Sequence, residues 1–164
     1  MIVISGIEKT PLDKNALEKV VKKYIGYKNR NKNISIFFVN NISDYGNYVF
    51  HNRRHIIKIS ASHHKHENGD FNNIKKLNER CQTYEFLSTI LHEIKHVLQR
   101  IEIGGKSVND SFILNNHLKP IKSLCKHYSK CELGARMFEA MHILEAVAIY
   151  ERTVKENKKA EKCL

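Results

Sequence analysis

Apolar residues recur with two different periods along this chain, and the period distinguishes strands from helices. Short runs rich in Ile, Val and Phe predict four strands, at residues 2–7, 34–39, 48–50 and 56–59. The last two runs flank the polar tetrapeptide His51-Asn52-Arg53-Arg54, which predicts a hairpin. All four runs precede residue 60, so one small sheet is expected in the first part of the chain.

Apolar residues spaced three or four positions apart predict three longer helices. The first has Thr10 as its N-cap, Pro11 at the first helical position and Gly26 at its end. The second runs from about residue 76 to residue 101, and shorter helices are expected between residues 107 and 128.

The last predicted helix spans about residues 130–157, and the charged residues 158–164 are expected to fray. Its predicted apolar face consists of Leu133, Met137, Phe138, Met141, Leu144, Val147 and Ala148. The pattern predicts an α+β fold, in which an antiparallel or mixed sheet of three or four strands packs on the second and last helices. With 41% hydrophobic and 27% charged residues, residues 1–164 are expected to form one domain.

The second helix carries the pattern His92-Glu93-Ile94-Lys95-His96. Two histidines four positions apart lie one above the other on a helix, so both rings can reach one metal ion. The glutamate after the first histidine can then polarise a metal-bound water. The apolar residues around the motif form one arc of the helix, away from both histidines: Phe86, Leu87, Ile90, Leu91, Ile94, Val97 and Leu98.

A catalytic zinc ion usually takes three protein ligands and leaves one position for water, so a third ligand is required. Glu132 is the preferred candidate, because it opens the last helix and the small residues Gly134 and Ala135 allow a close approach. Ser129-x-x-Glu132 is also a capping box, in which Glu132 only satisfies a backbone N–H group. Glu139, two turns later on the same face, is the alternative ligand.

These features resemble a minimal zincin of the glutamate-ligand type, the gluzincin-like metallopeptidases. Glu132-x-x-Ala135-x-x-Phe138 is similar to the E-x-x-A-x-x-F pattern on the ligand helix of ImmA/IrrE-type peptidases. Small metallopeptidases of phages and mobile elements and SprT-like proteases share this outline, and the resemblance covers roughly residues 34–150. The chain departs from the ImmA/IrrE pattern at Glu139, where that pattern prefers alanine, and in a longer interval between His96 and Glu132.

The resemblance implies a zinc-dependent metallopeptidase that hydrolyses peptide bonds of a protein substrate. One Zn²⁺ per chain is expected on His92, His96 and Glu132, and Glu93 is expected to take a proton from the metal-bound water. Candidates for contact with the substrate or the transition state are Arg136, Tyr128, His127 and His142. The peptide is expected to add to an edge strand beside the cleft, formed by Ile56, Ile57, Lys58, Ile59 and Ser60.

The formal charge of +11 at pH 7 supports a second hypothesis. A positive surface attracts nucleic acid or an acidic protein, so the alternative is a catalytically silent binding protein on a zincin scaffold. No nucleic-acid recognition motif accompanies the charge. The sequence has no signal-like segment and no apolar stretch near the ~20 residues that span a bilayer. We therefore expect a cytoplasmic protein with reduced cysteines, rather than a membrane protein or a secreted toxin-like protease.

Overall fold

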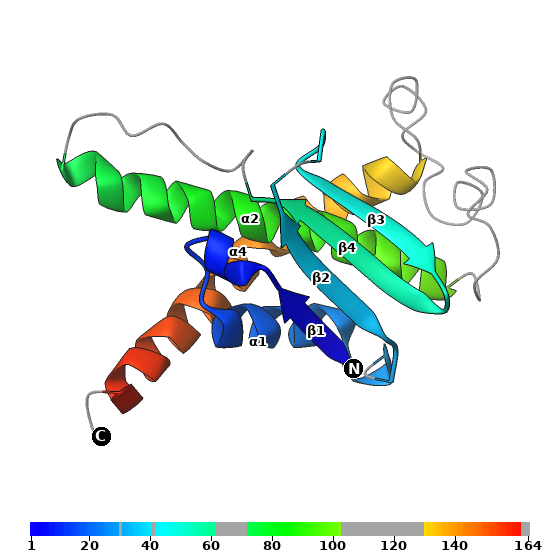
Figure 1. Cartoon of the computed structure of the whole chain (residues 1–164), viewed down its shortest axis with the longest axis horizontal. Helices are drawn as coiled ribbons and strands as arrows, with labels where there is room; N and C mark the ends of the chain where they lie inside the picture. Colours follow the sequence, from blue (N-terminus) through cyan, green and yellow to red (C-terminus); the bar gives the residue numbers. More distant parts are fainter. Residues whose placement is uncertain (30, 41, 62–71, 103–129, 162–164) are drawn as a thin grey trace.

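A four-stranded sheet and three α-helices make up the part of the chain that the computed structural model describes, which is residues 1–29, 31–40, 42–61, 72–102 and 130–161 (Figure 1). The strands are β1 (Ile2–Ser5), β2 (Ile34–Val39), β3 (Gly46–His51) and β4 (Arg54–Ser60). The α-helices are α1 (Lys14–Ile25), α2 (Asn72–Glu102) and α4 (Lys130–Glu161), and two short 3₁₀ turns are η1 (Ile7–Lys9) and η2 (Tyr27–Asn29). The predicted α+β class is confirmed.

The sheet is mixed, with the strand order β1-β2-β4-β3. β1, β2 and β4 run parallel, and β3 pairs antiparallel with β4. The prediction that residues 56–60 form an edge strand is therefore wrong, because β4 lies between β2 and β3. Its side chains agree with an inner position, since Ile57 and Ile59 are fully buried, as in the apolar strands of parallel sheets. The edge strand next to β4 is β3.

The hairpin between β3 and β4 is confirmed, and its turn has an unusual backbone. His51 pairs with Arg54, which leaves a loop of two residues, Asn52 and Arg53. Their φ angles are 49° and 59°, so both residues are in the left-handed region. Two positive φ values in a row are the mark of a type I′ turn, whose twist matches that of the strands it joins.

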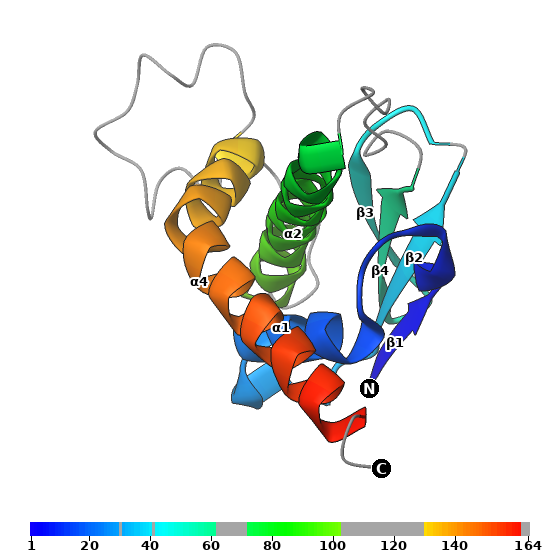
Figure 2. The ribbon, with the colours of Figure 1, turned by 90° about the vertical axis from the view of Figure 1, so that its left-hand side faces the viewer.

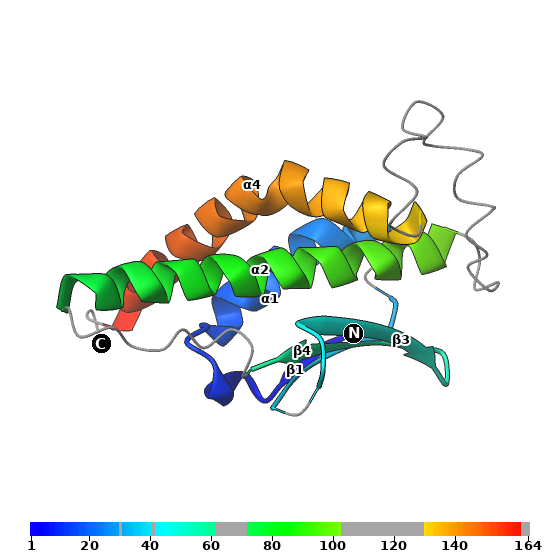
Figure 3. The same cartoon turned by 90° about the horizontal axis from the view of Figure 1, so that it is seen from above.

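Helices α1 and α2 cover one face of the sheet, and α4 lies on the outer side of α2 (Figures 2 and 3). The predicted apolar arc of α2 is confirmed, because all of its members are buried except Leu98, which is partly buried. Phe86 of this arc meets Phe38 of β2 edge to face, with ring centroids 5.9 Å apart. Each fully buried aliphatic or aromatic side chain contributes about 1.5–3 kcal/mol to stability. The histidine face of α2 is consequently turned away from this core.

The start of α1 differs from the prediction. The N-cap is Asp13, whose side-chain oxygen accepts the N–H of Ala16 at 2.8 Å. Thr10 instead follows η1, where its hydroxyl donates to the carbonyl of Ile7 and accepts the N–H of Leu12. The backbone N–H of Asp13 also donates to the hydroxyl of Tyr150 on α4, so a contact distant in sequence helps to set the helix start.

The α4 helix begins at Lys130 as predicted but continues to Glu161, so residues 158–161 are helical rather than frayed. Its predicted apolar face is wrong in part. Met137, Met141 and Leu144 are 39%, 74% and 77% exposed. Leu133 is buried as predicted, and the other buried apolar residues of the helix beyond it include two small ones: Ala135, Ile143, Ala146 and Tyr150. Small side chains at a contact let two helices approach closely, and this rotates the larger apolar residues outward.

The remaining expectations concern membrane-spanning helices and the short helices predicted between residues 107 and 128. No helix in the described part of the chain has the length and apolar character needed to cross a membrane. The shorter helices predicted between residues 107 and 128 lie outside the described residues.

Replacing one residue of the type I′ turn is expected to stabilise the protein. Arg53→Gly should raise the free energy of unfolding by about 1 kcal/mol, because glycine adopts a positive φ without the steric penalty of a side chain. The measurement is urea denaturation followed by circular dichroism. Arg53→Ala is the control, since it removes the charge but keeps a Cβ atom; an equal gain in both variants would contradict the backbone explanation.

Candidate metal centre

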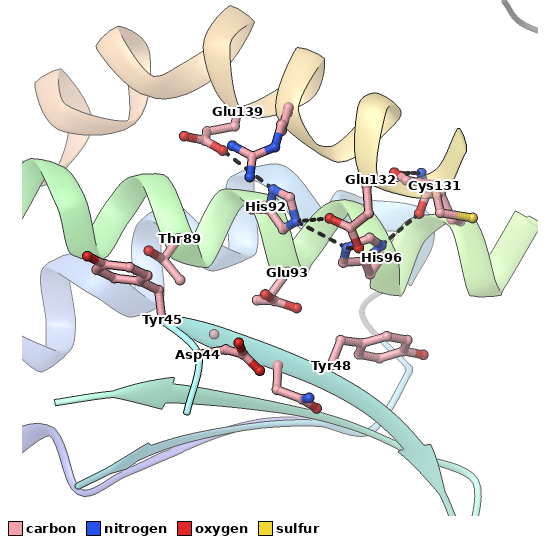
Figure 4. Close-up of a pocket in the computed structure, with 14 residues that line it drawn as sticks. Asp44, Tyr45, Tyr48, Thr89, His92, Glu93, His96, Cys131, Glu132 and Glu139 are labelled. Carbon is pink, nitrogen blue, oxygen red and sulfur yellow. Dashed lines mark hydrogen bonds and ion pairs between the residues drawn. The ribbon is translucent and has the colours of Figure 1, made fainter. Parts of the chain in front are cut away.

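Helix α2 presents His92 and His96 on the same side, one turn apart, as the motif predicts (Figure 4). Their Nε2 atoms are 3.2 Å apart, and their rings meet edge to face with centroids 4.9 Å apart. Both side chains are mostly buried, at 15% and 13% exposure. The two imidazoles therefore point their Nε2 atoms at one common position.

Glu132 reaches the same position from the first turn of α4. One carboxylate oxygen lies 3.0 Å from Nε2 of His92, and the other lies 3.2 Å from Nε2 of His96. One ligand atom from each of the three residues lies within 4.8 Å of the others. His92, His96 and Glu132 thus form a group that could hold a metal ion, as the sequence predicted.

The Nδ1 atoms of the two histidines face other side chains. Nδ1 of His92 lies 3.5 Å from one carboxylate oxygen of Glu139, and the other oxygen of Glu139 accepts a hydrogen bond from the hydroxyl of Ser88. Nδ1 of His96 lies 3.0 Å from the side-chain oxygen of Gln99. Glu139 therefore faces the nitrogen of His92 that points away from the other two candidate ligands. It can support the His92 ring by hydrogen bonding, but it does not belong to the group of His92, His96 and Glu132.

The candidate ligand atoms lie close together. Nε2 of His92 lies 3.2 Å from Nε2 of His96, and a different carboxylate oxygen of Glu132 lies 3.0 Å from the first nitrogen and 3.2 Å from the second. A neutral histidine with its hydrogen on Nδ1 has an unprotonated Nε2, so in that state the two rings and the carboxylate would bring electron-pair donors together. Such donors attract a cation to the point where they converge.

A cleft of about 710 Å³ opens at this group, between α2 and the start of β3. Glu93 enters it from α2 and is only 5% exposed. Figure 4 shows its carboxylate directed toward the start of β3, where Asp44 lies opposite. The motif glutamate and the proposed ligands therefore share one cavity. The cleft is lined by Asp44, Tyr45, Gly46, Asn47, Tyr48, Thr89, His92, Glu93, His96, Gln99, Cys131, Glu132, Arg136 and Glu139.

Gly46 lets β3 approach α2 at Glu93. A Cβ atom at this position would lie 2.7 Å from the Thr89 methyl and 2.8 Å from a carboxylate oxygen of Glu93. Both distances are shorter than atoms of these kinds tolerate, so a side chain would displace Glu93 or the strand. The wall of the cleft beside Glu93 is consequently bare backbone.

Burial and neighbouring charges shift the pKa values of the site in opposite directions. Burial raises the pKa of Glu93 to about 7; His92 opposes the rise, and the charges of Glu132 and Asp44 add to it. Burial alone would lower the pKa of His92, but hydrogen bonding to Glu139 and the surrounding carboxylates outweigh it and raise that pKa. For Glu139, burial is outweighed by hydrogen bonds from His92 and Ser88, and the pKa is lowered.

A tyrosine–histidine pair, Tyr48 and His55, lies next to the ring of His96. Tyr48 of β3 stacks on His96 with ring centroids 6.4 Å apart, and its hydroxyl is 2.8 Å from Nδ1 of His55 on β4. Burial, followed by the positive charges of Lys32 and Arg100, lowers the pKa of His55. His55 is therefore held in its neutral form beneath the site.

The four residues predicted to contact the substrate or the transition state differ in where they lie. Arg136 lines the cleft, and its positive charge contributes to the lowered pKa of Glu139. His142 does not reach the cleft; it packs against Tyr24 and Phe138, because ten residues beyond Glu132 the helix presents another face. Tyr128 and His127 lie outside the described residues.

Sequence reasoning gave no role to several residues that line the cleft, among them Gln99, Tyr48 and Asp44. Gln99 lies three positions after His96, so helical spacing could have placed it beside that ring. Tyr48 and Asp44 had no such signal, because they come from the strand side and their position depends on the sheet order.

No protein-family model, no curated protein and no solved structure matches this chain. Any assignment of function consequently depends on the geometry of the site itself.

Metal binding should distinguish the roles of the two glutamates on α4. Glu132→Gln is expected to lose bound metal, because it removes a charged ligand. Glu139→Gln is expected to keep one ion per chain with about 10- to 100-fold lower affinity, because it weakens only the support of His92. Metal content by mass spectrometry and competition with a chelator measure both effects. The opposite pattern, with metal lost only in Glu139→Gln, would exchange the two roles.

His55 should make stability depend on pH. The unfolded chain binds a proton at this histidine near pH 6.5, whereas the folded protein resists protonation because the pKa of His55 is lowered. The contribution of His55 to the free energy of unfolding should therefore be lost as the pH drops below about 6.5, so the wild type should lose stability relative to His55→Gln over this range. Denaturation of metal-free protein across this range is the measurement. His51→Gln, an exposed position on β3, is the control and should resemble the wild type.

Proposed function

We propose that this chain is a zinc-dependent metallopeptidase that hydrolyses peptide bonds of a protein substrate. The observation that carries the proposal is the group of His92, His96 and Glu132 in one cleft with the buried Glu93. A binding protein has no need for a buried carboxylate beside a set of ligands, whereas hydrolysis needs both.

The chemistry of the ligands favours zinc. Two imidazole nitrogens and one carboxylate are a set that zinc binds in hydrolytic enzymes, while calcium and magnesium prefer oxygen ligands throughout. When bound, zinc supplies a Lewis acid that polarises a carbonyl group and makes water more acidic. His92, His96 and Glu132 would hold the ion, and Glu139 and Gln99 would orient the two rings.

Glu93 is proposed as the general base. It follows His92 directly on α2 and faces the cleft, so it lies beside the ligands without belonging to them. Burial lifts its pKa to about 7 in the metal-free protein, and a cation bound beside it would lower this pKa and favour the ionised carboxylate. A carboxylate in this environment can take a proton from the attacking water and deliver it to the leaving amine.

The substrate is proposed to lie along β3. This strand is at the edge of the sheet, and its first half lines the same cleft as Glu93. An extended peptide can add to such an edge through main-chain hydrogen bonds. The close approach of Gly46 to Glu93 supports this placement, since it holds the start of β3 beside the proposed base.

Removing the proposed base should abolish hydrolysis and leave the metal in place. Glu93→Gln keeps the size of the side chain but cannot accept the proton, so the rate should fall by about 10²- to 10⁴-fold or more. Cleavage of a fluorescence-quenched peptide library, with metal content measured in parallel, tests this. Glu102→Gln, an exposed position at the end of the same helix, is the control.

Two outcomes would overturn the proposal. Wild-type protein that takes up no zinc from metal-replete buffer would remove its basis. Zinc uptake without cleavage, together with salt-sensitive binding to nucleic acid that Glu93→Gln leaves unchanged, would favour the binding-protein hypothesis.

A further inference from the structure

We propose that Gln99 is a positioning residue that sets the protonation pattern of His96 and ties α2 to the first turn of α4. Its side chain bridges a proposed metal ligand on one helix and the backbone next to the other ligand on the second helix. The inference deepens the proposed metal site and rests on it in part. It concerns hydrogen atoms that exist with or without a metal ion.

The side chain of Gln99 is almost fully enclosed and uses both ends of its amide. The residue is 3% exposed. Its amide nitrogen donates to the backbone carbonyl of Cys131 at 3.0 Å, and its amide oxygen lies 3.0 Å from Nδ1 of His96. A buried amide with both ends satisfied has one orientation, because turning it around would break both contacts.

The orientation of this amide fixes the position of a proton on His96. A backbone carbonyl can only accept a hydrogen bond, so the NH₂ group of Gln99 must face Cys131. The oxygen of the amide must then face His96, and an oxygen without hydrogen requires a donor opposite it. Neutral His96 therefore carries its hydrogen on Nδ1, and its Nε2 atom presents a lone pair.

That lone pair is directed at the proposed metal position. Nε2 of His96 lies 3.2 Å from Nε2 of His92 and 3.2 Å from a carboxylate oxygen of Glu132. Without Gln99, the acceptors that remain for His96 among these neighbours are Glu132 and Nε2 of His92, and both would draw the hydrogen to Nε2. The same nitrogen would then be blocked as a ligand.

The amide nitrogen of Gln99 contacts the other helix, α4. Cys131 is buried and immediately precedes Glu132, so a bond to its carbonyl holds the turn of α4 from which the third ligand projects. Gly134 belongs to the same contact, because a Cβ atom there would lie 3.0 Å from the amide nitrogen of Gln99. Gln99 thus joins the position of Glu132 to the orientation of His96.

Other side chains at position 99 would separate the two functions. Glutamate accepts from Nδ1 of His96 but, when charged, cannot donate to Cys131. Methionine has a similar length and can do neither, which removes both contacts with little change in volume. Gln99→Glu and Gln99→Met therefore test the histidine and the helix contact independently.

The direct test is the state of His96 in the metal-free protein at a pH where the ring is neutral. Nitrogen-15 NMR of the imidazole identifies which ring nitrogen carries hydrogen. The wild type and Gln99→Glu are expected to show hydrogen on Nδ1, and Gln99→Met is expected to show a shift to Nε2. Gln82→Met, on the same helix and away from the cleft, is the matched control and should resemble the wild type.

Zinc affinity, measured by competition with a chelator, gives the second readout. Gln99→Met should bind zinc about 10- to 100-fold more weakly than the wild type, and Gln82→Met should be unchanged. Wild-type His96 with hydrogen on Nε2 would overturn the proposal, and so would an unchanged ring in a folded Gln99→Met. The wild-type spectrum alone decides the point if that variant does not fold.

The two proposals can fail separately. A wild type that binds no zinc but shows hydrogen on Nδ1 would remove the metallopeptidase and leave the role of Gln99 toward His96. A wild type that binds zinc and cleaves peptides, but carries the hydrogen of His96 on Nε2 in the metal-free state, would support the metallopeptidase and overturn the role of Gln99.

Discussion

The packing of α4 against α2 is the contact on which the site depends, because two of its three ligands come from one helix and the third from the other. α2 alone places His92 and His96, since four residues make about one turn. Glu132 joins them only when α4 lies against α2, with the small residue Ala135 buried in the same turns. The opposite face of α2 rests on the sheet, so one helix connects the core of the protein with its cleft.

Much of this arrangement follows from local patterns in the sequence. The strand at 34–39, the hairpin and the buried arc of α2 were predictable, because period and turn residues are local properties. The pair His92 and His96 follows from helical spacing in the same way. Glu132 was predictable as a candidate from its place at a helix start, although the same position also suits a helix cap.

The remainder depends on contacts between segments distant in sequence. β4 is an inner strand because β1 and β2 pair in parallel on its other side, and no local signal reports that order. The inward face of α4 is set by how closely it approaches its neighbours, which favours Ala146 over the larger Leu144. Helical spacing could place Gln99 beside His96, but its contact with the backbone of Cys131 on α4 depends on the packing of two helices and has no local signal.

The order of the ligands along the chain also has a consequence in time. His92 and Glu132 are 40 positions apart, and domains of a nascent chain fold from the N-terminus. A growing chain that has been synthesised to Cys131 already contains the sheet, both histidines and Glu93, yet it lacks the third side chain of the group. Completion of the candidate metal group is therefore delayed until α4 has been made and has docked against α2.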